Sequence, residues 1–170
     1  EGFVITEFLP DVPWAGKYNV INCPGMHQFR EGRWLKNPNY LLDYAEYWCR
    51  EKTFARKYSF PIAYSFWEFY KVHPDTVFIK KSYAALKEIY ARWEESHWDE
   101  KAGLFWQKDG YDGMEVSISG ALSKDATGYR ATINSYMYAD ALALAEMAKL
   151  LDIQSDVEYY SAKAEMLKSA

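Results

Sequence analysis

The feature that most constrains the fold is a series of apolar stripes with helical spacing, separated by connections of unequal length. Leu41, Ala45 and Trp48 fall on one face of a helix expected at about 38–51, and Pro38 suits its first turn. Strand-like alternation of apolar and polar residues is scarce along the rest of the chain. The sequence therefore predicts an all-α fold.

Four further helices are expected. An aromatic helix lies near 59–72, and Pro74-Asp75 ends it and caps the next. Ser155-Asp156-Val157-Glu158 is predicted to be a capping box that opens the last helix. Two more apolar stripes define the remaining helices, one through Phe78, Ala85, Leu86, Ile89 and Trp93 to about His97, the other through Tyr138, Ala141, Leu142, Ala145, Ala148 and Leu151.

The helices are expected to form antiparallel pairs joined by alternating short and long connections, which is typical of an array of α/α hairpins. A fixed repeat of about 34 residues is not seen, which disfavours a regular solenoid. The printed sequence stops inside the fifth helix without a cap. We therefore expect residues 1–170 to be the N-terminal part of one longer catalytic domain.

Composition excludes several functional classes. The 170 residues are 49% hydrophobic and 26% charged, as in a folded domain with a sizeable core, and the net charge of −4 disfavours nucleic acid as a partner. Since a run of about eighteen apolar residues is absent, no membrane span is expected. Cys23 and Cys49 could form a bridge, although free thiols are the better expectation.

Residues 98–132 are the most informative region for function. They hold five of the nine glycines, and residues 109–120 combine three carboxylates with three glycines. Glycine lets a backbone approach a ligand, and carboxylates provide acid/base groups. Trp106 and Tyr111 flank the carboxylates, and flat apolar rings suit a sugar, whose C–H faces stack on them. An acidic surface turn is the alternative, but it would not need these rings.

Three segments resemble the six-hairpin, (α/α)6-toroid glycoside hydrolases, within them the trehalase-like and family 63-like group that includes mannosylglycerate hydrolases. Residues 24–34, PGMHQFREGRW, are similar to the Pro-Gly, aromatic, Arg, Glu, Trp motif of the trehalase type. Residues 113–117, GMEVS, resemble the segment that holds the general acid. Residues 133–138, INSYMY, resemble the segment that opens the following inner helix.

The resemblance covers roughly residues 20–165 and implies that the chain is the N-terminal part of a toroid, with the general base in the absent C-terminal half. Two residues depart from the family pattern. Glu115 stands in place of the usual Asp, and Leu35 where an Asp commonly follows the Trp. The second departure puts trehalose specificity in doubt.

Glu115 is the expected catalytic acid. An inverting glycosidase needs a protonated carboxyl for the leaving oxygen and a second carboxylate that activates water. Met114, Val116 and Trp106 are apolar neighbours that would raise the pKa of the Glu115 carboxyl. Asp112 is the competing candidate, because it lies three residues away and is followed by glycine.

The substrate-binding candidates are polar and aromatic residues in the Pro-Gly motif, beside the acidic loop, and at or just before the start of the following helix. We expect them to face one concavity with the acidic loop, binding sugar hydroxyls or a carboxylate; surface salt bridges and helix capping are the alternatives for the charged and amide groups. They are Arg30, Glu31, Arg33, Trp34, Trp106, Tyr111, Arg130 and Asn134.

The predicted function is hydrolysis of a glycosidic bond in a small oligosaccharide or sugar conjugate, with a carbohydrate as substrate and no cofactor. No essential metal is expected, since His27, His73 and His97 are too scattered for a zinc site. A noncatalytic carbohydrate-binding or scaffold protein would use the same aromatics. A histidine-based sugar epimerase is disfavoured because none of the histidines lies in the glycine-rich loop.

Overall fold

The structure is a computed structural model in which residues 2–10, 12–15, 17–50, 59–108, 111 and 127–170 are described. Two short 3-10 turns, η1 and η2, precede the first helix. In chain order the elements are η1 (Pro13–Ala15), η2 (Lys17–Asn19), α1 (Gly25–Gly32), α2 (Asn39–Arg50), α3 (Ile62–Tyr70), α4 (Thr76–His97), β1 (Trp98–Asp99), β2 (Leu104–Lys108), β3 (Thr127–Tyr129), α6 (Ala131–Leu150) and α7 (Gln154–Ser169).

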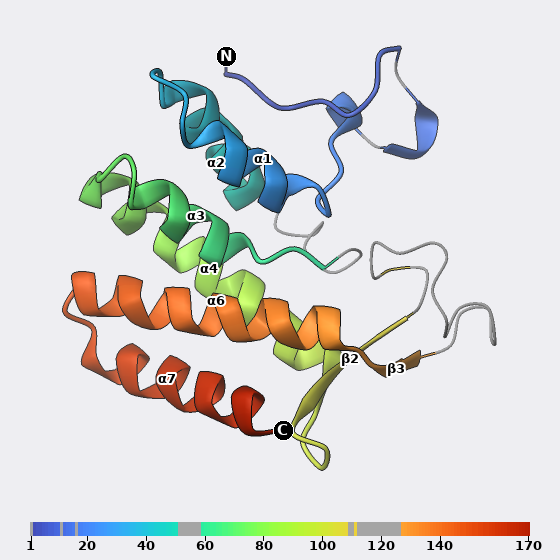
Figure 1. Cartoon of the computed structure of the whole chain (residues 1–170), viewed down its shortest axis with the longest axis vertical. Helices are drawn as coiled ribbons and strands as arrows, with labels where there is room; N and C mark the ends of the chain where they lie inside the picture. Colours follow the sequence, from blue (N-terminus) through green and yellow to red (C-terminus); the bar gives the residue numbers. More distant parts are fainter. Residues whose placement is uncertain (1, 11, 16, 51–58, 109–110, 112–126) are drawn as a thin grey trace.

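The helices form two layers (Figure 1). Helices α1, α3 and α6 lie side by side and run in the same direction, and α2, α4 and α7 return in the opposite direction as a second layer. Ion pairs join neighbours in the second layer, with Lys87 to Asp156 at 2.6 Å and Lys163 to Glu94 at 2.8 Å between α4 and α7. The arrangement is part of an α/α toroid, so the all-α prediction is confirmed.

The connections differ in length at the two ends of the array. Segments 33–38, 71–75 and 151–153 join each helix of the first layer to its return helix. Segments 51–61 and 98–130 lead back to the starts of α3 and α6. The described parts of the longer connections, residues 59–61, 98–108 and 127–130, therefore lie at the end where the first-layer helices begin, on the right in Figure 1. We call this the helix-start end, and the opposite one the helix-finish end.

Aromatic side chains fill the space between the layers. Phe29 of α1 stacks on Tyr44 of α2, with ring centroids 5.5 Å apart, and packs against Phe66 of α3 at 5.0 Å. On the other side, Tyr90 of α4 meets Tyr160 of α7 edge to face at 5.4 Å. Aromatic side chains thus provide much of the packing between the helices.

The predicted helices are confirmed, with corrections at three places. Helix α1 lies ahead of the first predicted helix, within residues 24–34, and residues 98–132, for which no secondary structure was predicted, contain strands β1, β2 and β3. The capping box is wrong: α7 begins at Gln154, so Ser155 already lies inside the helix, and Ile153 at the N-cap makes no side-chain cap. Asp75 does cap α4, accepting from the Val77 N–H at 2.8 Å.

A carboxyl group from the middle of α6 holds the start of α3. Oδ1 of Asp140 accepts from the N–H of Tyr64 at 2.9 Å, and the N–H groups of Ala63 and Ile62 also bond to this carboxyl. The first N–H groups of a helix have no partner within the helix, and Pro61 at the N-cap of α3 provides no side-chain cap. Asp140 therefore supplies from a neighbouring helix what the local sequence lacks.

This contact also sets how the two helices are staggered. Asp140 lies nine residues after the first residue of α6, which at 1.5 Å per residue is roughly 13 Å along the axis. The start of α3 is therefore set back from the start of α6. The helix-start end is stepped rather than flat.

We predict that Asp140→Ala lowers the free energy of unfolding by about 1–3 kcal/mol or more, because buried N–H groups lose their acceptor. Asp140→Asn retains an oxygen and should cost less. Burial raises the pKa of the Asp140 carboxyl from 3.8 to about 8, against the effect of the three N–H donors. At pH values between 3.8 and about 8, the Asp140 carboxyl keeps its proton in the folded state and loses it in the unfolded state.

The stabilisation that Asp140 contributes is consequently complete at acid pH and is lost as the pH rises through about 8. Relative to Asp140→Asn, the wild type should lose up to about 1.4 kcal/mol per pH unit within that window. Chemical denaturation of both proteins at pH 5 and pH 8 measures this change. A difference that is the same at both pH values contradicts the raised pKa.

Candidate functional site

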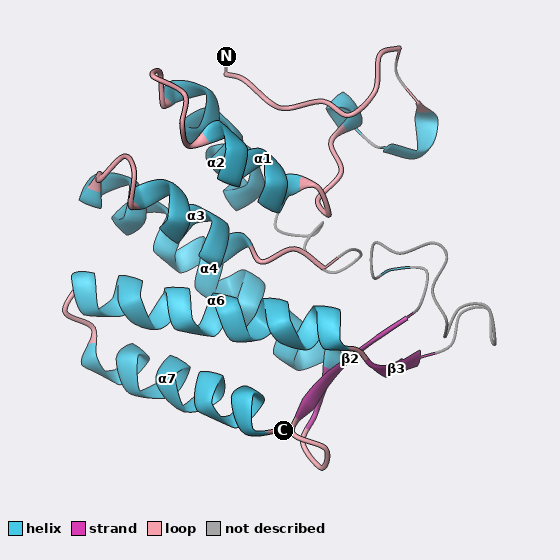
Figure 2. Ribbon diagram, in the orientation of Figure 1, coloured by secondary structure: helices cyan, strands magenta, loops and turns pink. Residues whose placement is uncertain are grey.

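A small antiparallel sheet stands at the helix-start end, beside the first turn of α6 (Figure 2). The strands lie in the order β1-β2-β3, and Trp106 of β2 is opposite Tyr129 of β3. Phe105 and Gln107 are fully buried against the helices, so the alternate residues of β2 face outward. The sequence missed this sheet because its strands are only two to five residues long.

Two predicted binding residues, Arg130 and Asn134, lie where β3 becomes α6. The amide of Asn134 donates to the carbonyl oxygens of Phe105 and Arg130, at 2.8 and 2.9 Å, and accepts from the N–H of Phe105 at 2.8 Å. Nε of Arg130 donates to the carbonyl of Gln107 at 3.3 Å. Both side chains thus tie the sheet to the helix.

The same two residues line a cavity of about 430 Å³ between the β2–β3 hairpin, the start of α6 and the end of α7. A volume of this size is in the range of small-molecule sites. Aromatic, hydroxyl, amide and cationic groups face it, namely Tyr129, Arg130, Asn134, Ser135, Tyr138 and Lys168. Such a lining can stack on a ring and bond to its hydroxyl or acidic groups.

Trp106 and Tyr111 remain at this end of the molecule. The ring of Trp106 packs on His97, with centroids 4.6 Å apart, and Tyr111 is partly exposed with Nζ of Lys108 5.8 Å from its ring. Tyr129 donates its hydroxyl hydrogen to Asp99 at 2.6 Å. This hydrogen bond is the main reason that the pKa of the Asp99 carboxyl lies below its usual value.

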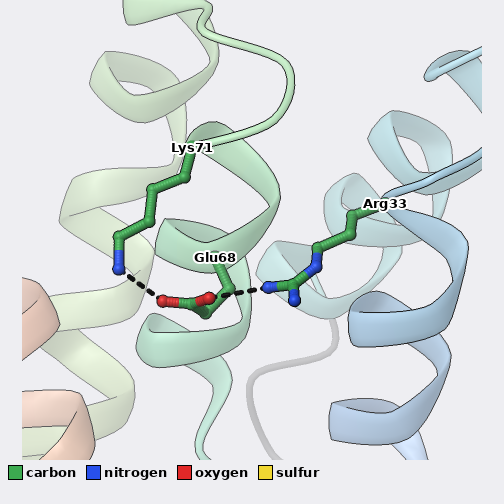
Figure 3. A network of polar contacts seen from close by, with 3 residues as sticks. All are labelled: Arg33, Glu68 and Lys71. Atoms are coloured by element: carbon green, nitrogen blue, oxygen red, sulfur yellow. Dashed lines mark hydrogen bonds and ion pairs between the residues drawn. The ribbon is translucent and has the colours of Figure 1, made fainter.

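Arg33 and Trp34 are at the opposite, helix-finish end. Arg33 pairs with Glu68 of α3 at 2.6 Å, and Lys71 reaches the other oxygen of Glu68 at 2.5 Å (Figure 3). Trp34 is 67% exposed, with the Arg33 guanidinium 4.9 Å from its ring, and His73 Nε2 donates to the Arg33 carbonyl at 2.7 Å.

The structure therefore does not bring all predicted site residues into one concavity. Arg130, Asn134, Trp106 and Tyr111 share the helix-start end, whereas Arg33 and Trp34 do not. The reason is that residues 25–32 form a helix, which carries the end of the motif to the far side of the array. Arg30 and Glu31 are exposed in the last turns of α1.

The two catalytic candidates, Glu115 and Asp112, lie outside the described residues. Within the described ranges, no three His, Cys, Asp or Glu side chains are grouped so that they could hold a metal ion. Cys23 and Cys49 are not joined by a disulfide. None of the described helices is long and apolar enough to cross a membrane.

Sequence reasoning missed two buried polar residues at this end. Asp140 interrupts the apolar stripe of α6, and a charged residue on a core face is a signal that could have identified it. Gln107 is fully buried, accepts from the Lys108 N–H at 2.8 Å, and has an Nε2 group with no hydrogen-bond partner. Nothing in its local sequence distinguishes it from an exposed strand residue.

The fold and the position of the long connections define a helical-toroid protein with its candidate site at the helix-start end. Residues 17–170 match the family model described as mannosylglycerate hydrolase MGH1-like glycoside hydrolase domain, so the chain belongs to that family. A solved structure titled "Sialidase" matches with a TM-score of 0.91 and 36% identity over 99% of this chain. The matched part is 16% of that chain's length. A comparison with curated proteins finds no match.

We predict that Glu68→Ala lowers the free energy of unfolding by about 1–3 kcal/mol, because it leaves the half-buried Arg33 guanidinium without its carboxylate. Burial is the largest single influence and by itself would raise the pKa of the Glu68 carboxyl. The hydrogen bonds and positive charges of Lys71 and Arg33 together outweigh burial and hold this pKa below its usual value. This stabilisation is present at neutral pH and is lost as the pH falls through the folded-state pKa.

The matched control is Glu146→Ala, which breaks an exposed pair with Lys149 and should cost less than about 1 kcal/mol. Thermal and chemical denaturation of the two variants compares them. Equal costs would mean that the Arg33–Glu68–Lys71 network contributes no more than a surface pair.

Proposed function

We propose that this chain is part of a glycoside hydrolase that cleaves a glycosidic bond in a small oligosaccharide or sugar conjugate, with inversion. The family match over residues 17–170 carries the proposal. The long connection before α6 supports it, because it includes the acidic, glycine-rich segment of the sequence and its described strands, β2 and β3, contribute Leu104 and Tyr129 to the cavity.

In this mechanism Glu115 is the general acid, and Asp112 is the alternative. A protonated Glu115 carboxyl would give its proton to the leaving oxygen while a carboxylate on the opposite face of the sugar activates water. The base would come from a later part of the protein. The structure titled "Sialidase" is long enough to include such a segment, because the matched part is only 16% of its length.

Residues around the cavity would bind the sugar. Arg130 lines the cavity and offers a tethered guanidinium, while Tyr111 and Trp106 lie outside its lining at the same end of the array and would offer ring faces. Arg30 and Glu31 are exposed on α1 and can take part if the substrate extends across the first layer. Arg33 and Trp34, at the helix-finish end, would contact substrate only as an accessory surface.

We further propose that residues 1–170 are the N-terminal part of one (α/α)6 catalytic domain, and that its C-terminal half is their partner. Leu142 of α6 and Met166 of α7 are each more than 40% exposed. Further helical hairpins packed on this side would remove those apolar groups from water. No nucleic acid or membrane partner is part of the proposal.

A noncatalytic helical carbohydrate-binding or scaffold protein is the second candidate, favoured by the exposed aromatic rings at both ends of the array. It predicts that sugar binding survives the loss of Glu115. Glycoside turnover by the complete protein separates the two candidates.

We predict that Glu115→Gln in the complete protein reduces turnover of an alkyl glycoside by at least about a hundredfold, with little change in binding, because the amide retains the shape of the acid. The deficit should shrink on a glycosyl fluoride, whose leaving group departs without a proton. A panel of aryl glycosides and glycosyl fluorides of common hexoses, compared with their alkyl glycosides, provides the measurement.

Equal losses on both kinds of substrate would remove Glu115 from the acid role and assign it to Asp112, to be tested by Asp112→Asn in the same assay. If the wild-type protein binds sugars in the panel but hydrolyses none, the noncatalytic candidate is correct. The anomeric configuration of the first product, followed by NMR, tests whether hydrolysis proceeds with inversion.

A further inference from the structure

A second cavity lies at the edge of the array opposite α7, between the first residues of the chain and α2 (Figure 1). Its volume is about 540 Å³, which is in the range of small-molecule sites. Among the described residues, its lining shares none with the 430 Å³ cavity beside α6. Three aromatic and three charged residues contribute to the lining, namely Phe3, Tyr18, Tyr47, Asp43, Glu46 and Arg50.

Helix α2 supplies one side of this cavity, which we call the α2 cavity. The four lining residues at positions 43, 46, 47 and 50 follow the i, i+3, i+4, i+7 spacing that places side chains on one face of a helix. Tyr47 is buried, while Glu46 and Arg50 are exposed. The helix therefore contributes an aromatic ring with charged groups on either side of it.

The first residues of the chain form the other side and are held against the helices. The N–H of Phe3 donates to Oδ2 of Asp43 at 3.1 Å, and the Phe3 ring packs edge to face on Tyr40 with centroids 4.8 Å apart. Further along, Glu7 accepts from the side chain of Gln28 on α1. The Phe3 ring is nevertheless 55% exposed, so a fixed segment presents an apolar ring beside the cavity.

Tyr18 is held at the cavity in an unfavourable backbone conformation. Its φ of 66° lies in the left-handed region, which a bulky residue rarely adopts. The next residue, Asn19, is buried and fixes the turn by accepting from the N–H groups of Glu7 and Val12, at 2.9 and 2.8 Å. The Tyr18 ring is 51% exposed, and its centroid is 6.3 Å from that of Tyr47. Burial of the ring therefore does not account for a strained tyrosine here, whereas ligand contact would.

The chemistry of the lining favours an uncharged saccharide. Aromatic rings can stack on the C–H faces of a sugar, while carboxylates accept from its hydroxyl groups and a guanidinium donates to them. Two carboxylates, Asp43 and Glu46, against one guanidinium, Arg50, leave the lining with a net negative charge, which disfavours anionic sugars and phosphates. The 430 Å³ cavity has Arg130 and Lys168 in its lining, so the two cavities differ in the charge they prefer.

We propose that the α2 cavity is a second carbohydrate-binding site, which holds an uncharged oligosaccharide against Tyr18 and one face of α2. This goes beyond the proposed glycosidase function, because binding here requires no catalytic group and uses the opposite edge of the array. A saccharide chain attached here and at a further site would bind more tightly than at either site alone, provided that it is long enough to reach both.

The test uses Tyr18→Gly in the complete protein. Glycine removes the ring but adopts a positive φ without strain, so the variant should melt no lower than wild type. The matched control is Tyr159→Ala on α7, which removes a tyrosine of similar exposure, 45%, at the opposite edge. A second variant, Arg50→Ala, removes the hydroxyl donor at an exposed position and retains the ring.

The probes are four neutral hexasaccharides, namely cellohexaose, mannohexaose, maltohexaose and xylohexaose, each carrying a photoreactive diazirine at its reducing end. Brief illumination followed by peptide mass spectrometry locates the bound sugar. The dependence of labelling on probe concentration gives an apparent Kd for each labelled segment separately. Unlabelled neutral hexamers and hexagalacturonic acid, an anionic hexamer, serve as competitors.

We expect at least one neutral probe to label residues 2–20 or 39–50 saturably, in competition with its unlabelled form and not with hexagalacturonic acid. Tyr18→Gly should weaken the apparent Kd of this segment by about tenfold or more, through loss of the stacking ring, with an unchanged or higher Tm. Arg50→Ala should weaken it by about threefold or more, and Tyr159→Ala should stay within about twofold of wild type.

The inference is overturned if no neutral probe labels these segments saturably, or if hexagalacturonic acid competes as well as the neutral sugars. It is also overturned if Tyr18→Gly retains the wild-type Kd. Should Tyr18→Gly melt below wild type, Arg50→Ala decides in its place, and a wild-type Kd in that variant is equally contrary.

Glycoside turnover by the same wild-type sample distinguishes this inference from the proposed function. A protein that is labelled at the α2 cavity but turns over no glycoside retains the binding site and refutes the hydrolase. A protein that turns over glycosides without labelling at the α2 cavity refutes the second site alone.

Discussion

The rest of the array depends on a contact between two parallel helices, the Asp140 carboxyl and the first N–H groups of α3. A helix start buried in a protein needs acceptors, and α3 has a proline at its N-cap and no polar side chain of its own there. Placing the acceptor on α6 makes the two helices interdependent, because neither the buried carboxyl nor the buried N–H groups are satisfied alone. The stagger of the first layer follows from this requirement.

That stagger, together with the unequal connections, makes the two ends of the array different. At the helix-finish end short connections leave little chain beyond the helices, and the Arg33–Glu68–Lys71 network joins α1 to α3. At the helix-start end the longer connections lead back to the first layer, and the described part of the connection before α6 forms the small sheet. The candidate cavity lies at this end, where connecting segments stand on a rigid frame of helices.

The small sheet at the helix-start end depends on the helices for its stability. It is too short to be stable by itself, and its inner residues, Phe105 and Gln107, are buried against the helices that support it. Asn134 and Arg130 attach the sheet to the first turn of α6 by side-chain bonds to its backbone. The short strands are in this way tied to the first turn of a long helix.

The sequence by itself determined the helices, the all-α class and the family, because apolar spacing, proline positions and short motifs are local properties of the chain. It also predicted Arg130 and Asn134 as binding residues, and the structure shows that both line a cavity and bond to the backbone of β2. Only the tertiary structure decided that Arg33 and Trp34 lie away from Trp106, that Asp140 holds α3, and that three short strands interrupt the long connection. Each of these depends on residues far apart in sequence that meet through packing, and no periodicity within one segment records such a partner.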